Sequence, residues 1–243
     1  LTYLKGEASA TIDDGVDFPS RNIEKGVAQP WQKDSLYNKT SLPKNIVDNL
    51  KSTNSASFLV IKDGKLVHEE YFGEYKPTTQ TNSFSMAKAI TVLLMGLAIE
   101  DQKIQSENQK FADFYPNFNK VEHGNELTLR DLAAMEAGYY WDEDYRNPFL
   151  QNPRIYYGKN MAEALLKSPQ FEAKPGSRFE YQSGATQLLG FAIRKAVNVP
   201  LSAYASQKLW KPLGMESDAY WNVDEDNKME KTFCCINAIP RDY

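Results

Sequence analysis

The sequence predicts an α+β fold in which one β-hairpin is followed by a largely helical stretch. Two β-rich runs, Phe58–Ile61 and Leu66–Phe72, are joined through Asp63-Gly64, and Asp-Gly between apolar runs is a strong local hairpin signal. The run Ala87–Ile99 is apolar nearly all round and predicts a buried helix. Because a lone hairpin is not a stable sheet, the sheet predicted from these runs is incomplete.

Composition and charge argue against several classes of protein. The chain has 243 residues, 42% hydrophobic and 25% charged, an ordinary mix for one large globular domain or two modest ones. The net charge of −4 comes without a basic stripe, which argues against a nucleic-acid partner. The longest strongly apolar run, Ile90–Ile99, is shorter than the about 20 residues of a membrane span.

The first elements are predicted from turn residues and caps. Residues 1–40 are polar and rich in turn residues, so we expect an extended arm around the core. A short helix is expected over Pro43–Lys51, with Ser41 as its N-cap. The first hairpin strand, Phe58–Ile61, is apolar at every position, which indicates cover on both faces.

Downstream of the apolar helix, helices are expected to alternate with loops. Thr128 is expected to cap a helix that begins at Leu129, because Asp131 then lies in its first turn. The aromatic, proline-containing stretch 139–158 is expected to be a long loop. The remaining expected elements are helices at Met161–Lys167, Gln187–Val197 (ended by Asn198) and Leu201–Lys211, and a short strand through Phe179–Tyr181.

The cysteines and histidines give no disulfide or metal signature. Cys234 and Cys235 are neighbours, and adjacent cysteines rarely reach disulfide geometry, so we expect both to be unpaired, buried structural residues. Two histidines are too few for a histidine-rich metal site. The first residue is Leu1 rather than methionine, which indicates a processed or trimmed chain.

The search for catalytic motifs leaves one pattern, Ser-x-x-Lys. The sequence contains no Gly-x-Ser-x-Gly elbow, Walker A loop, Gly-x-Gly-x-x-Gly loop or His-Glu-x-x-His motif. Residues three apart on a helix face the same side, so the lysine amine of Ser-x-x-Lys can reach the serine hydroxyl. A lysine made neutral by burial can act as the base that activates this hydroxyl.

Context separates the two Ser-x-x-Lys matches, because the pattern is short enough to occur by chance. Ser41–Lys44 opens a polar surface helix, where the serine is expected to be a cap. Ser85–Lys88 opens the most apolar helix, whose free N-terminal N–H groups suit a reaction that develops an oxyanion. The plainer alternative for this second pair is a serine cap beside a lysine that reaches solvent.

Several stretches, taken in order, resemble the serine β-lactamase and penicillin-binding protein superfamily, in particular its class C-like branch. Asn82–Ala89 is similar to the start of the superfamily's active-site helix, and Phe58–Lys65 to the branch's first hairpin. The other similar stretches are Leu127–Leu132, Ala137–Gly138, Pro175–Ser183, Gln187–Gly190 and Pro212–Met215.

This resemblance implies a β-lactamase/transpeptidase-like fold, in which an antiparallel sheet flanked by helices accompanies a mainly helical subdomain. It divides the chain into an arm with the first hairpin (1–84), a mainly helical part (85–200) and a return toward the α/β part (201–243).

The resemblance also implies roles for particular residues. Ser85 is implied as the nucleophile, Lys88 as its base and Tyr181 as the group that passes protons to the leaving group, although a packed core tyrosine is the alternative for Tyr181. Ser183 stands where many β-lactamases have asparagine, and Tyr145 lies on the aromatic loop. Both are implied as substrate-binding residues, with surface packing as the alternative for Tyr145.

The sequence departs from the superfamily pattern in two ways. The Tyr-x-Ser form resembles the esterase and 6-aminohexanoate-dimer hydrolase branch, as does Phe233–Ala238. The third superfamily motif, Lys or His, then a small residue, then Gly, is absent after Tyr181. Since the chain stops at Tyr243 inside an expected helix, we expect an N-terminal portion of a longer protein, with the missing C-terminal segment as the partner that completes the sheet.

The implied function is a serine hydrolase of the carboxylesterase or amidase kind, which cleaves a small ester, amide or peptide through an acyl-enzyme without a metal or organic cofactor. The alternative is a sensor or scaffold of the same fold that binds penicillin or peptide and acylates slowly or not at all. The resemblance also implies a bacterial periplasmic or secreted location.

Other chemical assignments have less support from the sequence. A site like that of the class A β-lactamases would use Glu163, which is instead expected to be an ordinary helix residue. A Ser-His-Asp triad would need His68 or His123. The acidic run Asp142-Glu143-Asp144 is expected to be a solvated turn.

Overall fold

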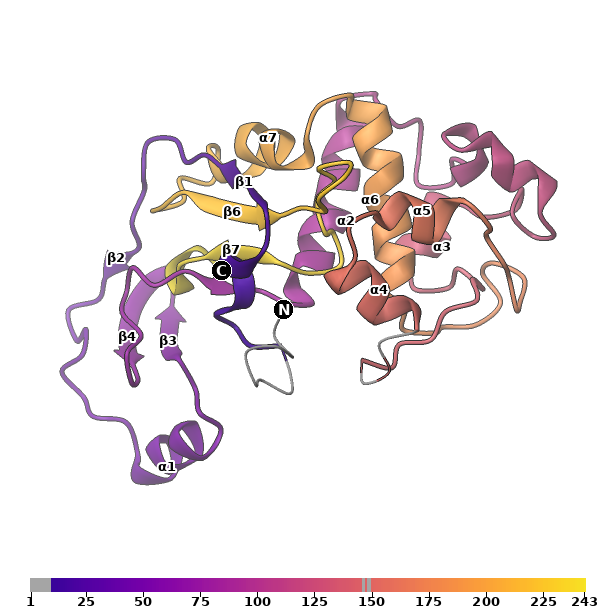
Figure 1. Ribbon diagram of the computed structural model, residues 1–243. Coiled ribbons are helices and arrows are strands. Elements are labelled where there is room, and N and C mark those ends of the chain that lie inside the picture. The colour runs from indigo at the N-terminus through magenta and orange to yellow at the C-terminus, as the bar shows by residue number, and fades with distance from the viewer. Residues whose placement is uncertain (1–9, 146, 148–149) are drawn as a thin grey trace.

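The computed structural model describes residues 10–145, 147 and 150–243 (Figure 1). Residues 1–9 of the expected arm and positions 146, 148 and 149 of the expected long loop lie outside the described residues. The strands are β1 (Ser20–Ile23), β2 (Gln32–Lys33), β3 (Ser57–Lys62), β4 (Lys65–Tyr71), β5 (Thr81–Asn82), β6 (Ala219–Asn222) and β7 (Ile236–Ala238). The α-helices are α1 (Lys44–Ser52), α2 (Met86–Glu100), α3 (Leu129–Ala133), α4 (Gln151–Tyr157), α5 (Met161–Leu166), α6 (Ser183–Val197) and α7 (Leu201–Ala205).

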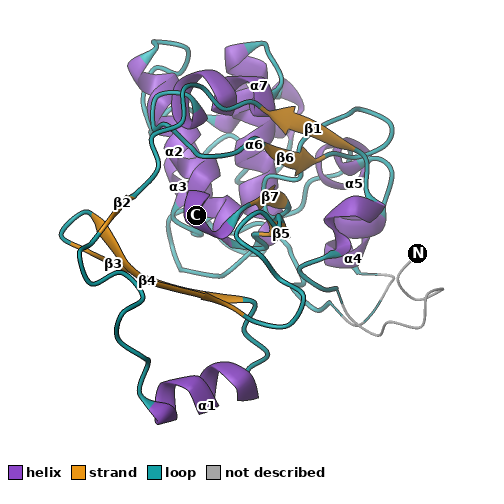
Figure 2. Cartoon of the chain, turned by 90° about the vertical axis from the view of Figure 1, so that its left-hand side faces the viewer, coloured by secondary structure: helices purple, strands orange, loops and turns teal. Residues whose placement is uncertain are grey.

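The strands form two sheets with mostly antiparallel pairing. The main sheet has the order β1-β6-β7-β5, and the smaller sheet has the order β2-β4-β3 with β2 parallel to β4. Figure 1 shows the smaller sheet and α1 on one side of the main sheet and the helices α2 to α6 on the other, and Figure 2 shows the smaller sheet and α1 extending away from the rest of the chain. The predicted α+β class, with an antiparallel sheet and flanking helices, is confirmed.

The predicted hairpin forms, but its first strand is less covered than expected. Asp63 and Gly64 have φ values of 51° and 72°, as a two-residue hairpin turn requires. The strand β3 lies at the edge of the smaller sheet and is half-buried to exposed, with Ile61 44% exposed. The prediction of cover on both faces is therefore wrong, because an apolar run does not show which strand is the edge.

The N-terminal arm supplies a strand to the main sheet. Arg21 and Asn22 of β1 pair with Trp221 and Tyr220 of β6, and Ile23 is fully buried. The arm is thus part of the sheet, which its polar composition did not indicate.

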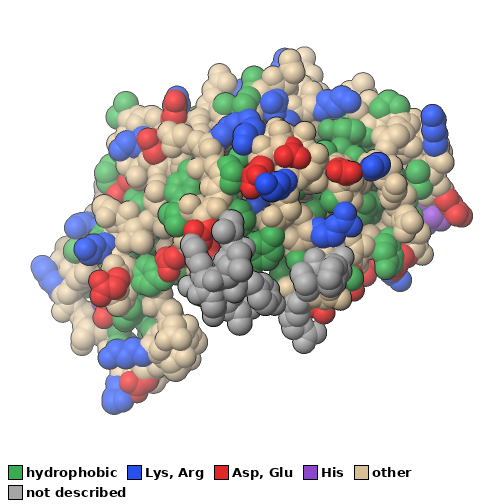
Figure 3. All heavy atoms as spheres, viewed as in Figure 1, with side chains coloured by type: hydrophobic (Ala, Val, Ile, Leu, Met, Phe, Trp, Pro, Cys, Tyr) green, Lys and Arg blue, Asp and Glu red, His purple; other side chains and the backbone are tan. Residues whose placement is uncertain are grey.

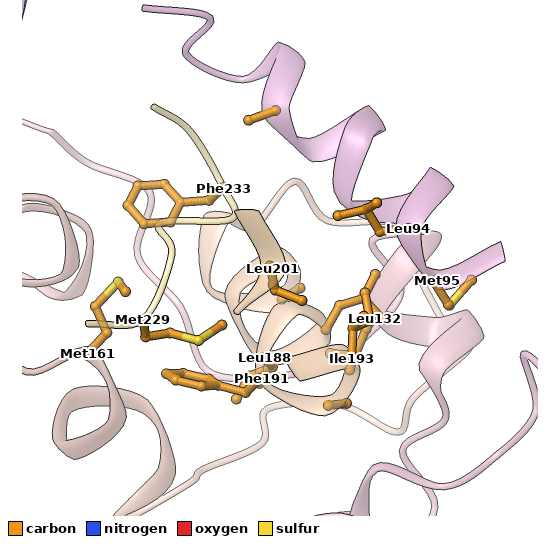
Figure 4. Packing of buried hydrophobic residues seen from close by; sticks show 14 of the residues in the cluster. Leu94, Met95, Leu132, Met161, Leu188, Phe191, Ile193, Leu201, Met229 and Phe233 are labelled. Atoms are coloured by element: carbon orange, nitrogen blue, oxygen red, sulfur yellow. The ribbon is translucent and has the colours of Figure 1, made fainter. Parts of the chain in front are cut away.

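The hydrophobic core lies between α2, α6 and the main sheet. One face of α2 is buried through Ala87, Leu94 and Ala98, whereas Met86 and Leu93 on the other are each 53% exposed. The prediction of a helix buried all round is corrected to a helix buried on one face, since its main partner α6 lies on one side. Figure 4 shows side chains from α2, α6 and the segment before β7 gathered in this core.

Helix ends follow the predicted caps in part. Thr128 and Asp131 form a reciprocal capping box at the start of α3, as predicted. Ser41 does not cap α1, which begins at Lys44 after Pro43 with no side-chain cap. Asn198 ends α6 in the left-handed conformation, as expected, although the helix begins at Ser183 rather than Gln187.

Two other elements differ from expectation. The long loop 139–158 contains α4, which accommodates Pro153 in its first turn, where proline breaks no helical hydrogen bond. The expected strand through Phe179–Tyr181 does not form, because the local sequence carries no information about whether a partner strand lies beside it. The expected helix at Met161 forms as α5, and the expected helix at Leu201 forms as α7 followed by a π-helical stretch over Ser206–Trp210.

The cysteines are bonded to each other. The structure joins Cys234 and Cys235 in a disulfide, so the prediction of unpaired cysteines is wrong. The backbone bends sharply at this point, with Cys235 at a φ of 75°, a bend that residue spacing does not indicate. Both residues are buried, as expected.

Charged side chains of both signs lie on the surface. Figure 3 shows Lys and Arg side chains interspersed with Asp and Glu over the face viewed. Within the described ranges, no helix has the length and apolar character needed to cross a bilayer.

A buried ion pair connects β4 to the C-terminal end of the described chain. The Arg241 guanidinium donates to both carboxylate oxygens of Glu69 and also to Glu216. Tyr37 and Tyr71 donate to the same Glu69 carboxylate. Although burial alone would raise the pKa of Glu69, the hydrogen bonds from Arg241 and Tyr37 lower it to about 2.

This lowered pKa predicts a loss of stability in acid. The contribution of Glu69 is fully present above its ordinary pKa of 4.5 and disappears as the pH falls through the folded-state value of about 2. The expected change in the free energy of unfolding is about 3 kcal/mol. Urea unfolding at several pH values between 6 and 2 measures it, with Glu69→Gln as the comparison. If the stability of Glu69→Gln fell as steeply with pH as that of the unmodified protein, Glu69 would not be the source of the acid sensitivity.

Candidate active site

A tight turn sets Ser85 at the start of α2. Phe84 has a φ of 44°, an uncommon value for a residue with a side chain, and its N–H donates to Asn82 Oδ1 at 2.9 Å. Ser83 is held on the first residue of β7: its N–H donates to the carbonyl of Ile236 at 2.7 Å, and its Oγ accepts from the Ile236 N–H at 3.2 Å. The turn is therefore fixed to the main sheet before the helix begins.

The Ser85 hydroxyl oxygen lies between a lysine and a tyrosine. Lys88 Nζ is 3.0 Å from Ser85 Oγ, one helical turn along α2. The Tyr181 hydroxyl donates to the same oxygen at 2.8 Å, across 96 residues of sequence. The structure thus brings together the three residues for which a catalytic role was expected.

Lys88 is largely shielded from solvent. Its side chain belongs to a residue that is 7% exposed, and Nζ also donates to the carbonyl oxygen of Phe233 at 2.9 Å. Nζ also lies over the ring of Tyr181, 4.9 Å from its centroid. The plainer alternative for the motif requires a lysine that reaches solvent. Lys88 does not reach solvent, so this alternative does not describe it.

The carbonyl of Phe233 belongs to a segment that runs between α2 and α6. Thr91 on α2 donates through its hydroxyl to the carbonyl of Thr232 at 2.9 Å. On the other side, the Thr232 N–H donates to Gln187 Oε1 of α6 at 2.9 Å. The resemblance singled out this stretch, but its contact with Lys88 could not be predicted. Every residue type carries a backbone carbonyl, so the residue at position 233 does not indicate the contact.

Tyr181 precedes α6 in a segment without regular secondary structure. It is 42% exposed, so the alternative of a packed core tyrosine does not describe it. The Glu180 N–H beside it donates to the carbonyl of Met135 at 2.8 Å, and two residues later α6 begins at Ser183.

The two expected substrate-binding residues share one partner, Glu143. The Ser183 hydroxyl is fully buried and donates to Glu143 Oε1 at 2.6 Å. The Tyr145 hydroxyl donates to the same oxygen at 2.5 Å, while Tyr145 as a whole is 60% exposed. Burial and the Glu143 carboxylate raise the pKa of Tyr145 to about 12, so its hydroxyl stays neutral near pH 7. Ser183 faces protein rather than solvent here, because Glu143 takes up its hydroxyl.

Glu143 corrects the expectation of a wholly solvated acidic turn. Besides Ser183 and Tyr145, the indole N–H of Trp141 donates to Glu143 Oε2 at 2.6 Å. Sequence reasoning missed this carboxylate because its donors come from residues on both sides of it and from 40 residues downstream.

The other candidate groups have partners away from Ser85. The exposed Lys44 pairs with Asp48, and Glu163 accepts from Lys167 on the surface of α5. The histidines lie beside glutamates of their own segments, His68 with Glu70 and His123 with Glu126. In residues 10–145, 147 and 150–243, no three His, Cys, Asp or Glu side chains gather as a metal site would require.

Comparison with known proteins identifies the family. Residues 43–232 match the model of the Beta-lactamase family. A curated relative named "Putative D-alanyl-D-alanine carboxypeptidase", from Escherichia coli (strain K12), is 25% identical over 181 residues. The match covers 66% of this chain and 42% of the relative, so the chain spans less than half of that relative's length.

Solved structures share the fold. One described as "Putative 6-aminohexanoate-dimer hydrolase from Bacillus anthracis" aligns with a TM-score of 0.79 and 23% identity, over 96% of this chain and 65% of that one. A class C β-lactamase aligns with a TM-score of 0.59 and 17% identity, over 82% of this chain and 60% of that one. The β-lactamase-like fold expected from the sequence is confirmed. Since the family model covers more than half of its residues, the chain belongs to the Beta-lactamase family.

Proposed function

We propose that the protein is a serine hydrolase that cleaves an ester or amide through an acyl-enzyme on Ser85. The observation that carries this proposal is the position of Ser85 Oγ, which lies 3.0 Å from Lys88 Nζ and 2.8 Å from the Tyr181 hydroxyl. A nucleophile with a proton acceptor and a second proton-transfer group within hydrogen-bond reach is the arrangement that acyl transfer needs.

The first step is attack on the carbonyl carbon of the substrate. The bond from Ser85 Oγ to that carbon forms while the hydroxyl proton passes to the pair formed by Lys88 and Tyr181. The bond to the leaving group then breaks, and Tyr181 supplies the proton that the departing oxygen or nitrogen takes up. Both members of the pair reach Oγ, so the first proton is taken by whichever member is unprotonated, the neutral amine of Lys88 or the phenolate of Tyr181.

The second step repeats the sequence with water. Water adds to the acyl carbon, its proton passes to the same pair, and Ser85 leaves as the alcohol with a proton returned by that pair. The Ser85 N–H, which makes no hydrogen bond within the described residues, would provide one donor of the oxyanion hole at the N-terminus of α2. No step in this sequence requires a metal or an organic cofactor.

The relatives support a small ester, amide or peptide as substrate. The names of the matched proteins refer to a carboxypeptidase, a β-lactamase and an amide-dimer hydrolase, which all suggest attack on an acyl carbon. A periplasmic or secreted location rests on this relationship and stays a prediction.

Labelling and turnover test the proposal together. We expect a fluorescent alkyl phosphonate to label the protein, Ser85→Ala to abolish the label, and Ser41→Ala, in the exposed second Ser-x-x-Lys match, to retain it. Steady hydrolysis of p-nitrophenyl acetate or butyrate, lost in Ser85→Ala, would support a hydrolase. Labelling without turnover would instead favour the acylating sensor or scaffold, and labelling that survives Ser85→Ala would overturn the site.

A further inference from the structure

Glu143 gathers donors from its own loop and from the start of α6. Its Oε2 accepts from the Trp141 indole at 2.6 Å and from the Ser183 N–H at 2.8 Å. Its Oε1 accepts from the Ser183 hydroxyl at 2.6 Å and from the Tyr145 hydroxyl at 2.5 Å. The carboxylate therefore already holds hydrogen bonds on both oxygens, and binding a cationic ligand is not needed to satisfy it.

One of the residues held by Glu143, Ser183, is close to Tyr181 in the chain. Ser183 is two residues further along the chain and is the first residue of α6, where the helix dipole favours a carboxylate. A second link ties the same two segments together, since Gln182 Nε2 donates to the carbonyl of Tyr139 at 2.7 Å. A Cβ on Gly184 would come within 2.4 Å of the Trp141 ring, so this loop and the first turn of α6 are closely packed.

Tyr181 has little other support on its C-terminal side. The strand expected through Phe179–Tyr181 does not form, so no β-ladder fixes the tyrosine backbone. Its hydroxyl must nevertheless stay within hydrogen-bond reach of Ser85, because a displacement of about 1 Å can lower a rate about 100-fold. The hydrogen bonds of Gln182 and Ser183 to Tyr139 and Glu143 hold the chain next to Tyr181, and so they can keep its hydroxyl near Ser85.

We propose that Glu143 is a positioning residue, which holds Tyr181 against Ser85 by clamping the start of α6 to the aromatic loop. This inference rests on the proposed function, because it assigns Glu143 a role in the same reaction. Glu143 touches none of the reacting groups and acts through Tyr181. By holding the Tyr145 hydroxyl it also links the exposed Tyr145 to the start of α6.

The hydrogen-bond pattern predicts how two substitutions at this position should differ. In Glu143→Gln, the amide oxygen can face the two N–H donors and the amide NH₂ can face two hydroxyls, which can reverse and accept. Glu143→Met offers none of these bonds. A positioning role therefore predicts nearly normal kcat in Glu143→Gln, within about 3-fold, and a loss of about 10- to 100-fold in Glu143→Met.

A double-mutant cycle tests whether the effect passes through Tyr181. We expect Glu143→Met to lower kcat for a p-nitrophenyl ester more than it raises KM, and to cause no further loss in a Tyr181→Phe background. Asp142→Asn, which removes the neighbouring exposed carboxylate charge, is the control and should match the unmodified protein. If Glu143→Met folds poorly by thermal unfolding, Ser183→Ala removes one donor and should show a smaller, equally Tyr181-dependent loss.

Several outcomes would overturn the proposal. An equal loss in Glu143→Gln and Glu143→Met would show that the charge matters, as in direct binding of a cationic substrate. A loss that persists in full in the Tyr181→Phe background would show a general effect on the loop. Absence of Ser85-dependent turnover in the unmodified protein would instead contradict the proposed function itself, so the two failures are distinguishable.

Discussion

Replacement of Lys88 by methionine should lower kcat/KM for ester hydrolysis by about 10³-fold, the scale of a lost general base. The side chain of methionine has a similar length, so it can fill the shielded position that the lysine stem occupies. The substitution removes the group 3.0 Å from Ser85 Oγ that can accept its proton. Methionine leaves no polar group of its own unpaired at this position, so the fold should keep most of its stability even though the Phe233 carbonyl loses a donor.

The measurement pairs kinetics with thermal unfolding. The value of kcat/KM for p-nitrophenyl butyrate and the rate of phosphonate labelling should fall together, with little change in Tm. Lys44→Met, in the exposed second Ser-x-x-Lys match, is the matched control and should leave both rates unchanged. If Lys88→Met retained activity within 10-fold of the unmodified protein, Tyr181 alone would be the base and the assigned role of Lys88 would be wrong.

Replacement of Arg241 by alanine should lower the free energy of unfolding by about 3 to 5 kcal/mol. Arg241 binds both oxygens of Glu69, whose side chain is 5% exposed. Removal of the guanidinium would leave the Glu69 carboxylate buried without its positive partner. This unpaired buried charge is what would destabilise the fold. The same change would remove the bond to Glu216.

Urea unfolding at pH 7 measures this effect. Lys44→Ala provides the comparison, because it breaks a solvent-exposed ion pair with Asp48, and exposed pairs contribute little. The variant Arg241→Ala should also lose much of the acid sensitivity between pH 4.5 and 2, since its Glu69 no longer has a strongly lowered pKa. A loss of stability no larger than that of Lys44→Ala would refute the assigned importance of the pair.

Features set by neighbouring residues could be predicted from the sequence. The Asp63-Gly64 turn needs two left-handed residues, and the Thr128 capping box needs a partner three residues away. The pairing of Ser85 with Lys88 follows from the helical repeat once the apolar helix is predicted to begin at that serine. In each case the decisive contact lies within a few residues, so the local sequence holds the whole signal.

Features set by distant residues could not be predicted in the same way. Glu143 looked like part of a charged turn, because its bond to Ser183 spans 40 residues. The Phe233 carbonyl that Lys88 contacts is 145 residues away and belongs to the backbone. The position of β3 at a sheet edge and the pairing of β1 with β6 likewise depend on which strands meet, which residue type does not encode.

The contact between Lys88 and Phe233 also bears on the order of events during synthesis. Helix α2 is synthesised before Phe233, and the carbonyl that accepts from Lys88 is made 145 residues after that lysine. A nascent chain that has not yet extended past residue 233 lacks this group, and it also lacks the carbonyl and N–H of Thr232 that hydrogen-bond to α2 and α6. The growing chain therefore cannot complete the described environment of its serine until most of these residues have been translated.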